Sequence, residues 1–322
     1  MSRQFTIVDG HRDHHPLFIG LVGPSSSGKT RSALRLAVGM QSVVGGEIVF
    51  INTEGKRGTM DLDLFKKKDG SPAIKHMAFD APYASLDYLD AILQARASGA
   101  KTIVIDSLSH EHEQEGGMLD YQEQELTRMA GDDYRKRETM QMLAWGKPKA
   151  ARRKLLTRGI MQTDVNIIAC FRAKETSKPV KMDGKNKVIA MGFMPIAGDE
   201  FVFEMALSCL LLPGSNGYPT WHPENPGEKI AVKRPDHFVD IVRDGEQLTE
   251  EVGAKLARWA TDRNARPATA PKEKSPIDQY AILLGEKLKA ASVGEIDALT
   301  LWWAETGETR MALNIPPERE EK

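Results

Sequence analysis

The sequence predicts an α/β fold with a mostly parallel central sheet and helices on both faces. Short runs of apolar and β-branched residues alternate with longer segments that have helical spacing. Five of these runs are almost continuously apolar, which indicates strands buried on both faces, as in a parallel sheet covered by helices. They are LFIGLVG (17–23), EIVFINTE (47–54), IKHMAFD (74–80), KTIVID (101–106) and DVNIIACF (164–171).

A different pattern begins near residue 176. The segment PVKMDGKNKVIAMG holds two runs of strand-forming residues around Asp183-Gly184, which predicts a β-hairpin. The further runs ALSCLLL, GYPTWH and KIAVKR predict antiparallel strands at the edge of the sheet. The helical pattern TEEVGAKLARWATDR (249–263), with Thr249 as its cap, ends this domain.

The C-terminal part of the chain has a separate organisation. The segment NARPATAPKEKSP (264–276) is rich in proline, alanine and charge and has no apolar period, which predicts a linker. Two amphipathic helical patterns follow within residues 277–310, and they form a unit too small to be very stable alone. We therefore expect a core domain of residues 1–263, a linker of 264–276 and a small helical tail of 277–322.

Composition limits the classes of function. The 322 residues carry a net charge of -1, so any contact with nucleic acid must come from a local basic patch. The longest apolar run, MALSCLLL, is too short to span a bilayer, and the first fifteen residues lack the apolar core of a secretory signal. The two cysteines, Cys170 and Cys209, lie in apolar segments, so we expect buried thiols rather than a disulfide. We expect a cytoplasmic protein without a membrane partner.

The segment GPSSSGKT (23–30) fits the pattern G-x-x-x-x-G-K-[ST], directly after a predicted strand and directly before a predicted helix. Small residues let such a loop wrap so that its backbone N–H groups point at a phosphate, and the helix N-terminus adds to the anion site. We expect ATP and Mg²⁺ as cofactors, with Lys29 reaching the β and γ phosphates and the Thr30 hydroxyl coordinating the metal. The predicted nucleotide-binding residues are Gly23, Pro24, Ser25, Ser26, Ser27, Gly28, Lys29 and Thr30.

Two carboxylates end predicted strands at the edge where the sites of open α/β sheets assemble. Asp106 ends KTIVID, where a P-loop NTPase needs a carboxylate to hold magnesium through its water shell. Glu54 ends the strand that follows the P-loop helix, so its carboxylate should emerge near the γ phosphate, where it can polarise an attacking water. The alternatives are an ordinary acid at the end of a strand for Asp106 and a solvated charge for Glu54.

Together, the P-loop, FINTEG with Glu54, IVIDS with Asp106 and the segment IIACFRAKE resemble the RecA-type ATPase core over about residues 15–245. Within that superfamily the chain is most similar to single-domain RecA-like ATPases that phages encode near recombination functions. The resemblance implies a RecA-like P-loop NTPase core that hydrolyses ATP with Mg²⁺, and it implies Glu54 as the base that activates water.

The resemblance also gives a role to Arg172, which ends the strand DVNIIACF. The family's polar residue at this position senses the γ phosphate, although RecA itself more usually has glutamine there. The alternative is that Arg172 forms an ion pair with Glu54 or Asp106. Glu54, Lys29 and Arg172 are therefore the predicted catalytic residues.

The segment after Arg172 is net basic and lies where the family places a DNA-contacting loop. Lysines on such a loop can neutralise phosphates without reading sequence, whereas the alternative is a solvated hairpin. A second basic stretch, GKPKAARRKLLTR (146–158), is either a track for DNA or a charged helix face, and residues 110–133 are strongly acidic where RecA itself has another DNA loop. The predicted DNA-binding residues are Lys178, Lys181, Lys185 and Lys187.

RecA-like ATPases usually act as rings or filaments, in which a basic residue of one subunit completes the site of the next. The resemblance therefore implies a homo-oligomer, with Lys233 or Arg234 in KIAVKRPDHF as the trans-acting finger. Adjacent residues of a strand point to opposite faces, so only one of the two can reach a phosphate. The alternative is an edge strand that basic residues protect from pairing.

Three classes of function follow from these expectations. The first is an ATPase that acts on single-stranded DNA in phage recombination or replication, in the cytoplasm of an infected or host bacterium, with a single-strand-binding or annealing protein as a further partner. The second is a nucleotide-gated loader that binds partner proteins without touching DNA. The third is a small-molecule kinase, which would need an arginine-rich lid where this chain is acidic instead.

Overall fold

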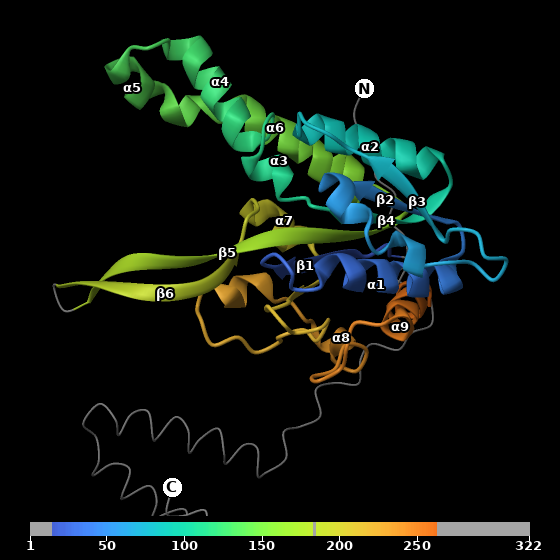
Figure 1. Cartoon of the computed structure of the whole chain (residues 1–322). Helices are drawn as coiled ribbons and strands as arrows, with labels where there is room; N and C mark the ends of the chain where they lie inside the picture. The colour runs from blue at the N-terminus through green and yellow to red at the C-terminus, as the bar shows by residue number, and fades with distance from the viewer. Residues whose placement is uncertain (1–14, 183–184, 263–322) are drawn as a thin grey trace, which may run out of the picture. The chain divides into compact units, whose positions relative to one another are not determined.

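A computed structural model of the chain describes residues 15–182 and 185–262, without the side chains of residues 180–187. The predicted linker and helical tail, and the predicted hairpin turn at 183–184, lie outside the described residues. Seven strands form one sheet in the order β3-β2-β4-β5-β1-β7, with β6 paired to β5 (Figure 1). The strands are β1 (Phe18–Gly23), β2 (Glu47–Asn52), β3 (Ile74–Ala78), β4 (Ala100–Asp106), β5 (Asn166–Met182), β6 (Lys185–Pro195) and β7 (Leu207–Leu210).

The predicted α/β fold class is confirmed. Strands lie at all five predicted runs, and every neighbouring pair from β3 to β7 is parallel. The predicted antiparallel hairpin is present as β5 and β6, but β5 is far longer than the run that predicted it, because it continues out of the sheet to form the hairpin.

The edge of the sheet beyond β1 differs from the prediction. β7 pairs parallel with β1, whereas its run predicted an antiparallel strand. GYPTWH and KIAVKR do not form strands and contribute only the single antiparallel bridges Leu210↔Thr220 and Ser208↔Lys233. A 3₁₀ turn occupies Glu228–Ala231, so the chain reaches the sheet edge only briefly at Lys233.

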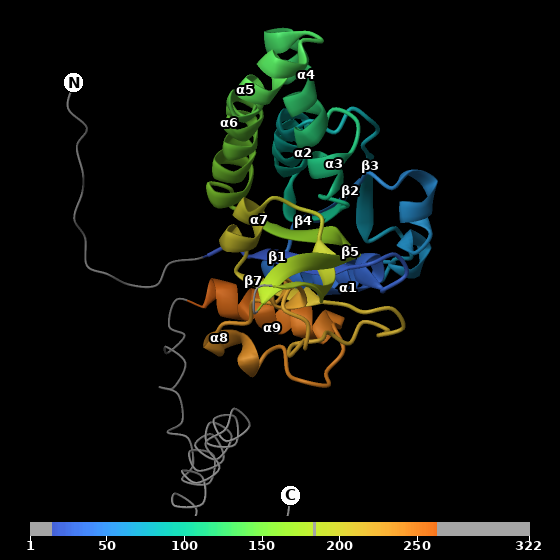
Figure 2. The same cartoon turned by 90° about the vertical axis from the view of Figure 1, so that its left-hand side faces the viewer.

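Helices cover both faces of the sheet (Figures 1 and 2). One face packs against α1 (Lys29–Val44) and α9 (Glu250–Thr261), and the other packs against α2 (Ser85–Ala97) and a π-helical turn, Leu155–Met161. Alternate residues of each strand point to opposite faces. In β2, for example, Phe50 joins the core under α1, while the next residue, Ile51, joins the core under α2.

The helices α1 and α9 touch through their backbones at two glycines. A Cβ atom on Gly39 would lie 1.8 Å from the Glu250 carbonyl oxygen, and one on Gly253 would lie 2.2 Å from the Leu36 carbonyl oxygen. The predicted cap of α9 is present, because the Thr249 side chain accepts a hydrogen bond from the Val252 N–H at 3.4 Å. Glycine therefore permits the close packing that fixes the first helix after the P-loop.

Two hairpins project from this core (Figure 1). One is the β5–β6 hairpin, and the other is the helical pair α4 (Met118–Ala130) and α5 (Tyr134–Ala144). The acidic segment that the sequence singled out thus forms α4 and the short helix before it. None of the helices in the described ranges is long and apolar enough to cross a membrane. The remaining helices are α3 (His110–Glu113), α6 (Gly146–Lys154), α7 (Asp199–Glu204) and α8 (Asp236–Val239), with 3₁₀ turns at Gly55–Thr59 and Leu62–Leu64.

Candidate nucleotide site

The segment 23–30 forms a tight loop between the carboxyl end of β1 and the first turn of α1. Gly28, directly before α1, has a φ of 86°, a left-handed conformation that glycine adopts without steric cost. A Cβ atom on Gly23 would lie 2.3 Å from the Leu211 carbonyl oxygen, so this glycine lets the loop pass close to the chain after β7. The loop therefore leads directly into a helix N-terminus, which is a favourable place for an anion.

Lys29 lies folded back over this loop. Its Nζ donates to the Pro24 carbonyl oxygen at 2.7 Å and to the Ser27 Oγ at 3.3 Å. Burial lowers the pKa of Lys29, and nearby groups that include Asp106 and Glu54 oppose that shift. The ammonium group is thus held inside the curve of the loop, where phosphates of a nucleotide would be its natural counterions.

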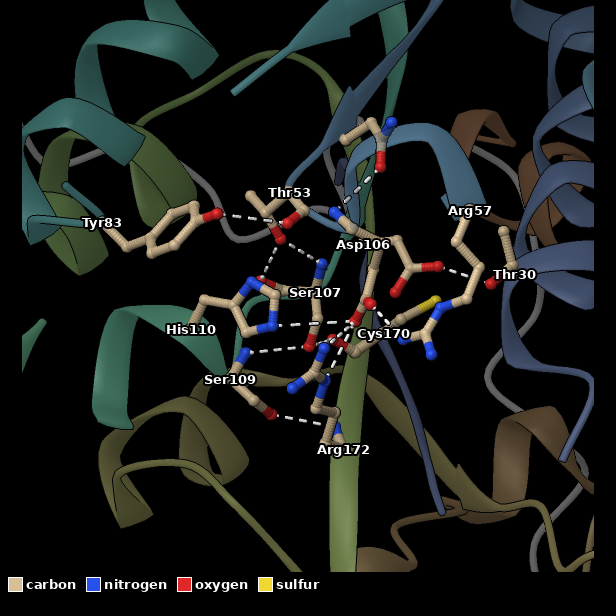
Figure 3. Close-up of polar contacts among 12 residues, drawn as sticks. Thr30, Thr53, Arg57, Tyr83, Asp106, Ser107, Ser109, His110, Cys170 and Arg172 are labelled. Atoms are coloured by element: carbon tan, nitrogen blue, oxygen red, sulfur yellow. Dashed lines mark hydrogen bonds and ion pairs between the residues drawn. The ribbon is translucent and has the colours of Figure 1, made fainter. Parts of the chain in front are cut away.

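Thr30 and Asp106 meet at the same end of the site. The Thr30 Oγ1 donates to the Asp106 Oδ2 at 2.5 Å, and Asp106 is buried at the end of β4 (Figure 3). Burial raises the pKa of Asp106 to about 6, although the Thr30 hydrogen bond and the Lys29 charge act in the opposite direction. One hydroxyl and one carboxylate thus lie together at the carboxyl ends of the parallel strands.

This donor pair fits Mg²⁺. The ion prefers oxygen ligands and is usually held by one or two carboxylates together with substrate phosphates and waters. In residues 15–182 and 185–262 there is no cluster of three or more His, Cys, Asp or Glu side chains that could hold a metal without such help. A metal bound by Thr30 and Asp106 would therefore need a nucleotide to complete its coordination.

Glu54 follows β2 and begins the 3₁₀ turn Gly55–Thr59. Its Oε1 accepts hydrogen bonds from the Arg172 Nε at 2.9 Å and from the Arg172 Nη2 at 2.7 Å, and its Oε2 accepts one from Arg57 (Figure 3). Burial alone would raise the pKa of Glu54, but the hydrogen bonds from Arg172 and Arg57 outweigh it and lower that pKa. The carboxylate is therefore ionised at neutral pH, and Arg172 adopts the ion pair that was the alternative to its sensor role.

The backbone geometry around Glu54 is fixed by Asn52. The Asn52 Oδ1 accepts from the Glu54 N–H at 3.0 Å, and its Nδ2 donates to the Gly55 carbonyl oxygen at 2.7 Å. A Cβ atom on Gly58 would lie 2.1 Å from the same Oδ1, so the turn closes tightly over this amide. The turn also brings Arg57 back toward Glu54.

These groups share one cavity of about 1150 Å³. This volume exceeds the range of roughly 300–1,000 Å³ that is typical of small-molecule sites, so the cavity has room for a nucleotide. Its lining includes Ser25, Ser26, Ser27, Gly28, Lys29, Thr30, Glu54, Arg57, Asp106 and Arg172. The sequence predicted all of these except Arg57.

Comparison with known proteins shows the family to which the chain belongs. The family model described as an AAA domain matches residues 15–198, which is more than half of the chain. The chain belongs to the AAA domain family. The matched segment of this AAA domain runs from before β1 to just after β6, and so contains the P-loop, Glu54, Asp106 and Arg172. It also contains β1 to β5, which pair in parallel in the sheet.

Two solved structures are similar to this AAA domain protein at low identity. One is a KaiC-like protein from the archaeon Pyrococcus horikoshii OT3, which is 16% identical over 55% of this chain and 79% of its own, with a TM-score of 0.26. The other is an ATPase of the type III secretion system of pathogenic bacteria, 14% identical over 85% of this chain and 73% of its own, with a TM-score of 0.34. A comparison with curated proteins finds no match.

The two residues expected to act as a trans finger, Lys233 and Arg234, form hydrogen bonds within their own chain. The Arg234 guanidinium donates to the Val242 carbonyl oxygen at 3.0 Å and to Asp244 at 3.1 Å, and lies 4.7 Å from the Trp221 ring centroid. The Arg234 side chain is 9% exposed, and its role as a trans finger stays a prediction. Lys233 donates to the Phe203 carbonyl oxygen at 2.9 Å, and its role stays a prediction.

The expected DNA-contacting lysines lie on the β5–β6 hairpin. Lys178 is exposed on β5 opposite Ile189, and strand register places Lys181, Lys185 and Lys187 further out. In the second basic stretch, Arg152 is buried in an ion pair with Glu111 at 2.7 Å, so this arginine stabilises the fold rather than facing a ligand.

Two residues near Glu54 were missed by the sequence analysis. Arg57 has a weak signal, because a residue three positions along a helical turn can reach back to Glu54. His110 has none beyond its place four residues after Asp106. The position of His110 depends on the path of the chain after β4, which brings this residue near Glu54.

Proposed function

We propose that this chain binds ATP with Mg²⁺ and hydrolyses it. The observation that carries the proposal is that the P-loop, the Thr30–Asp106 pair and Glu54 line a single cavity. These are the parts that phosphoryl transfer to water needs: an anion cradle, a metal-holding pair and a group that orients water.

Each residue has a defined task in this mechanism. The N–H groups of the loop and the helix N-terminus bind the phosphates, and Lys29 stabilises charge on the β and γ phosphates. Thr30 and Asp106 would hold Mg²⁺, which when bound neutralises charge that develops on the transferred phosphoryl group. Glu54 orients the attacking water and accepts its proton.

Glu54 can serve as a base only when its oxygens are free to face water. Both oxygens are now occupied by Arg172 and Arg57, and both arginines line the cavity. Guanidinium groups bind phosphate by charge-assisted hydrogen bonds, so a bound triphosphate competes with Glu54 for them. Arg172 would thereby report the γ phosphate, in keeping with the sensor role that the resemblance implies.

We further propose that the protein acts on single-stranded DNA in recombination or replication, as a homo-oligomer. The support is the continuity of β5, which runs from Arg172 at the nucleotide site into the projecting hairpin (Figure 1). Residues 174–187 carry five lysines against two acids, and Lys174 and Lys178 are exposed. A movement of Arg172 would thus be transmitted along one strand to a basic surface.

The test is an ATPase assay with and without single-stranded DNA. We expect Mg²⁺-dependent release of phosphate, stimulation by DNA of any sequence, and no turnover by Lys29→Ala. Transfer of phosphate to a metabolite would favour a kinase, and an absence of turnover with any acceptor would refute the proposal.

A second candidate, a loader of partner proteins, is favoured by the helical hairpin. Its helix α5 exposes Tyr134 (78%), Met142 (79%) and Leu143 (63%) on a segment that projects from the core. Large apolar side chains that are exposed on a projecting segment can mark a protein-binding site. Turnover that DNA leaves unchanged, together with no DNA binding at low salt, would favour this function over the first.

A further inference from the structure

His110 is a buried histidine whose ring has no hydrogen-bond partner. It begins α3 and is 4% exposed, and no described group hydrogen-bonds to its Nδ1 or Nε2. Buried polar atoms in folded proteins are almost always paired, and leaving one unpaired is costly. An unpaired imidazole therefore leaves a donor and an acceptor that can be paired when neighbouring groups move.

The nearest candidate for that partner is Glu54. The His110 Nε2 lies 3.7 Å from the Glu54 Oε1, which is too long for a hydrogen bond but needs a shift of less than 1 Å to become one. On its other side the imidazole packs against the Tyr83 ring at 5.0 Å, and the Tyr83 hydroxyl donates to the Thr53 carbonyl oxygen at 3.3 Å. The ring thus lies with Nε2 toward the Glu54 carboxylate.

The present partners of Glu54 differ from His110 in exposure. The side chains of Arg57 and Arg172 are 63% and 32% exposed and line the cavity, whereas that of His110 is 5% exposed. Phosphates that enter the cavity attract both guanidinium groups. They do not draw the imidazole away, because it is buried, packs against the Tyr83 ring and does not line the cavity.

We propose that His110 is a positioning residue that holds the Glu54 carboxylate when nucleotide is bound. The His110 Nε2–H donates to the Glu54 Oε1, while Arg172 and Arg57 turn toward the phosphates and leave the Glu54 Oε2 to face water. This inference rests on the proposed function of Glu54 as the base.

The charge of His110 suits this task. In the described state burial, aided by the charge of Arg172, lowers the pKa of His110 to about 4. Burial is the largest cause, and it still favours a neutral ring when Arg172 has turned toward the phosphates. A neutral N–H donor fixes a carboxylate with less loss of its basicity than a cation would cause. The imidazole therefore orients Glu54 and leaves it able to accept a proton.

A matched pair of variants tests the geometry of the hydrogen bond. In His110→Gln the amide nitrogen can reach the position of Nε2, whereas in His110→Asn it can reach only the position of Nδ1. We expect His110→Gln to keep kcat within about threefold, and His110→Asn to lower it by about 10-fold or more with KM for ATP unchanged, since a hydrogen bond to a charged group is lost. Parent-like kcat in His110→Asn, or equal losses in both variants, would overturn the proposal.

A double-mutant cycle separates this inference from the proposed function. If His110 acts through Glu54, His110→Asn should lower kcat no further in a Glu54→Gln background. An equal fold-loss in both backgrounds would show that His110 acts elsewhere. If Glu54→Gln itself keeps parent kcat, the role of Glu54 fails, whereas a slow Glu54→Gln beside a parent-like His110→Asn overturns the inference alone.

A measurement on the folded parent chain covers the case in which the His110 variants do not fold. Spectra of ¹⁵N-histidine-labelled protein with Mg²⁺ and a non-hydrolysable ATP analogue would be compared between the parent and Glu54→Gln. We expect the ring nitrogens of one of the eight histidines to shift, because its carboxylate acceptor is replaced by an amide. Histidine signals that are the same in both proteins would overturn the proposal.

Discussion

Replacing Glu54 with glutamine tests the centre of the proposed mechanism. The change keeps the size of the side chain but removes its charge and its ability to accept a proton. A positioned general base contributes about 10²- to 10⁴-fold to a rate. We therefore expect kcat for ATP hydrolysis to fall by about 100-fold or more, which corresponds to about 2.7 kcal/mol or more of activation free energy.

The same change should not weaken nucleotide binding. Hydrogen bonds from Arg172 and Arg57 lower the pKa of Glu54, so in the parent an ionised carboxylate competes with phosphates for both arginines. Glutamine removes this competing charge and leaves both arginines available to the nucleotide. We expect an equal or lower Kd for a fluorescent ATP analogue, measured beside kcat by phosphate release. Weaker binding with normal turnover at saturation would refute a role in activating water.

The remaining predictions concern the P-loop, the fold, the hairpin and pH. Lys29→Ala should abolish ATP turnover without changing the far-UV circular dichroism, and parent-like turnover would contradict the phosphate role. Gly39→Ala should destabilise the fold by about 1–3 kcal/mol in urea unfolding, because the new Cβ would lie 1.8 Å from a carbonyl oxygen of α9. The control, Gly146→Ala in α6, meets open space and should be neutral or slightly stabilising, so equal effects would refute this reasoning. The pKa of Glu54 is lowered in the folded protein, so its ionisation stabilises the fold above its ordinary pKa of 4.5. The difference in free energy of unfolding between the parent and Glu54→Gln should therefore shrink as pH falls below that value. A difference that is constant from pH 7 to pH 3.5 would contradict this prediction. Alanine at all four hairpin lysines should weaken binding to every single-stranded DNA and flatten the salt dependence by up to about 0.7 per lost phosphate contact, with the DNA-free ATPase rate unchanged. The four are Lys178, Lys181, Lys185 and Lys187.

The parts of the site that the sequence predicted depend on local rules. The P-loop motif fixes Lys29 and Thr30 within one turn of backbone, and the rule that parallel strands end at one edge brings Asp106 to Thr30. The same rule places Glu54 near the cavity, because β2 and β4 are neighbours in the sheet. Short-range spacing and strand direction were sufficient for these residues.

The parts that the sequence missed depend on tertiary contacts. Nothing in the run LSCL distinguishes a parallel from an antiparallel edge strand, because a short apolar strand can pair in either direction. KIAVKR has strand-forming residues, yet Arg234 bonds to Val242 and Asp244, which lie in a loop that follows it. His110 reaches Glu54 only because the chain turns sharply after β4, and no periodic pattern encodes such a turn.

The pairing of Arg172 with Glu54 is compatible with both roles expected of this arginine, an ion-pair partner and a sensor of the γ phosphate. In the described structure the two arginines neutralise Glu54 and hold it away from water, so the base is occupied while no phosphate competes for them. A triphosphate would bring more negative charge than one carboxylate, and the guanidinium groups would move toward it. If so, the base becomes available only when its substrate is present, and the residue that releases it lies at the start of the hairpin that carries the predicted DNA contacts. Arg172 would then pair with Glu54 when no nucleotide is bound and contact the γ phosphate when ATP is bound.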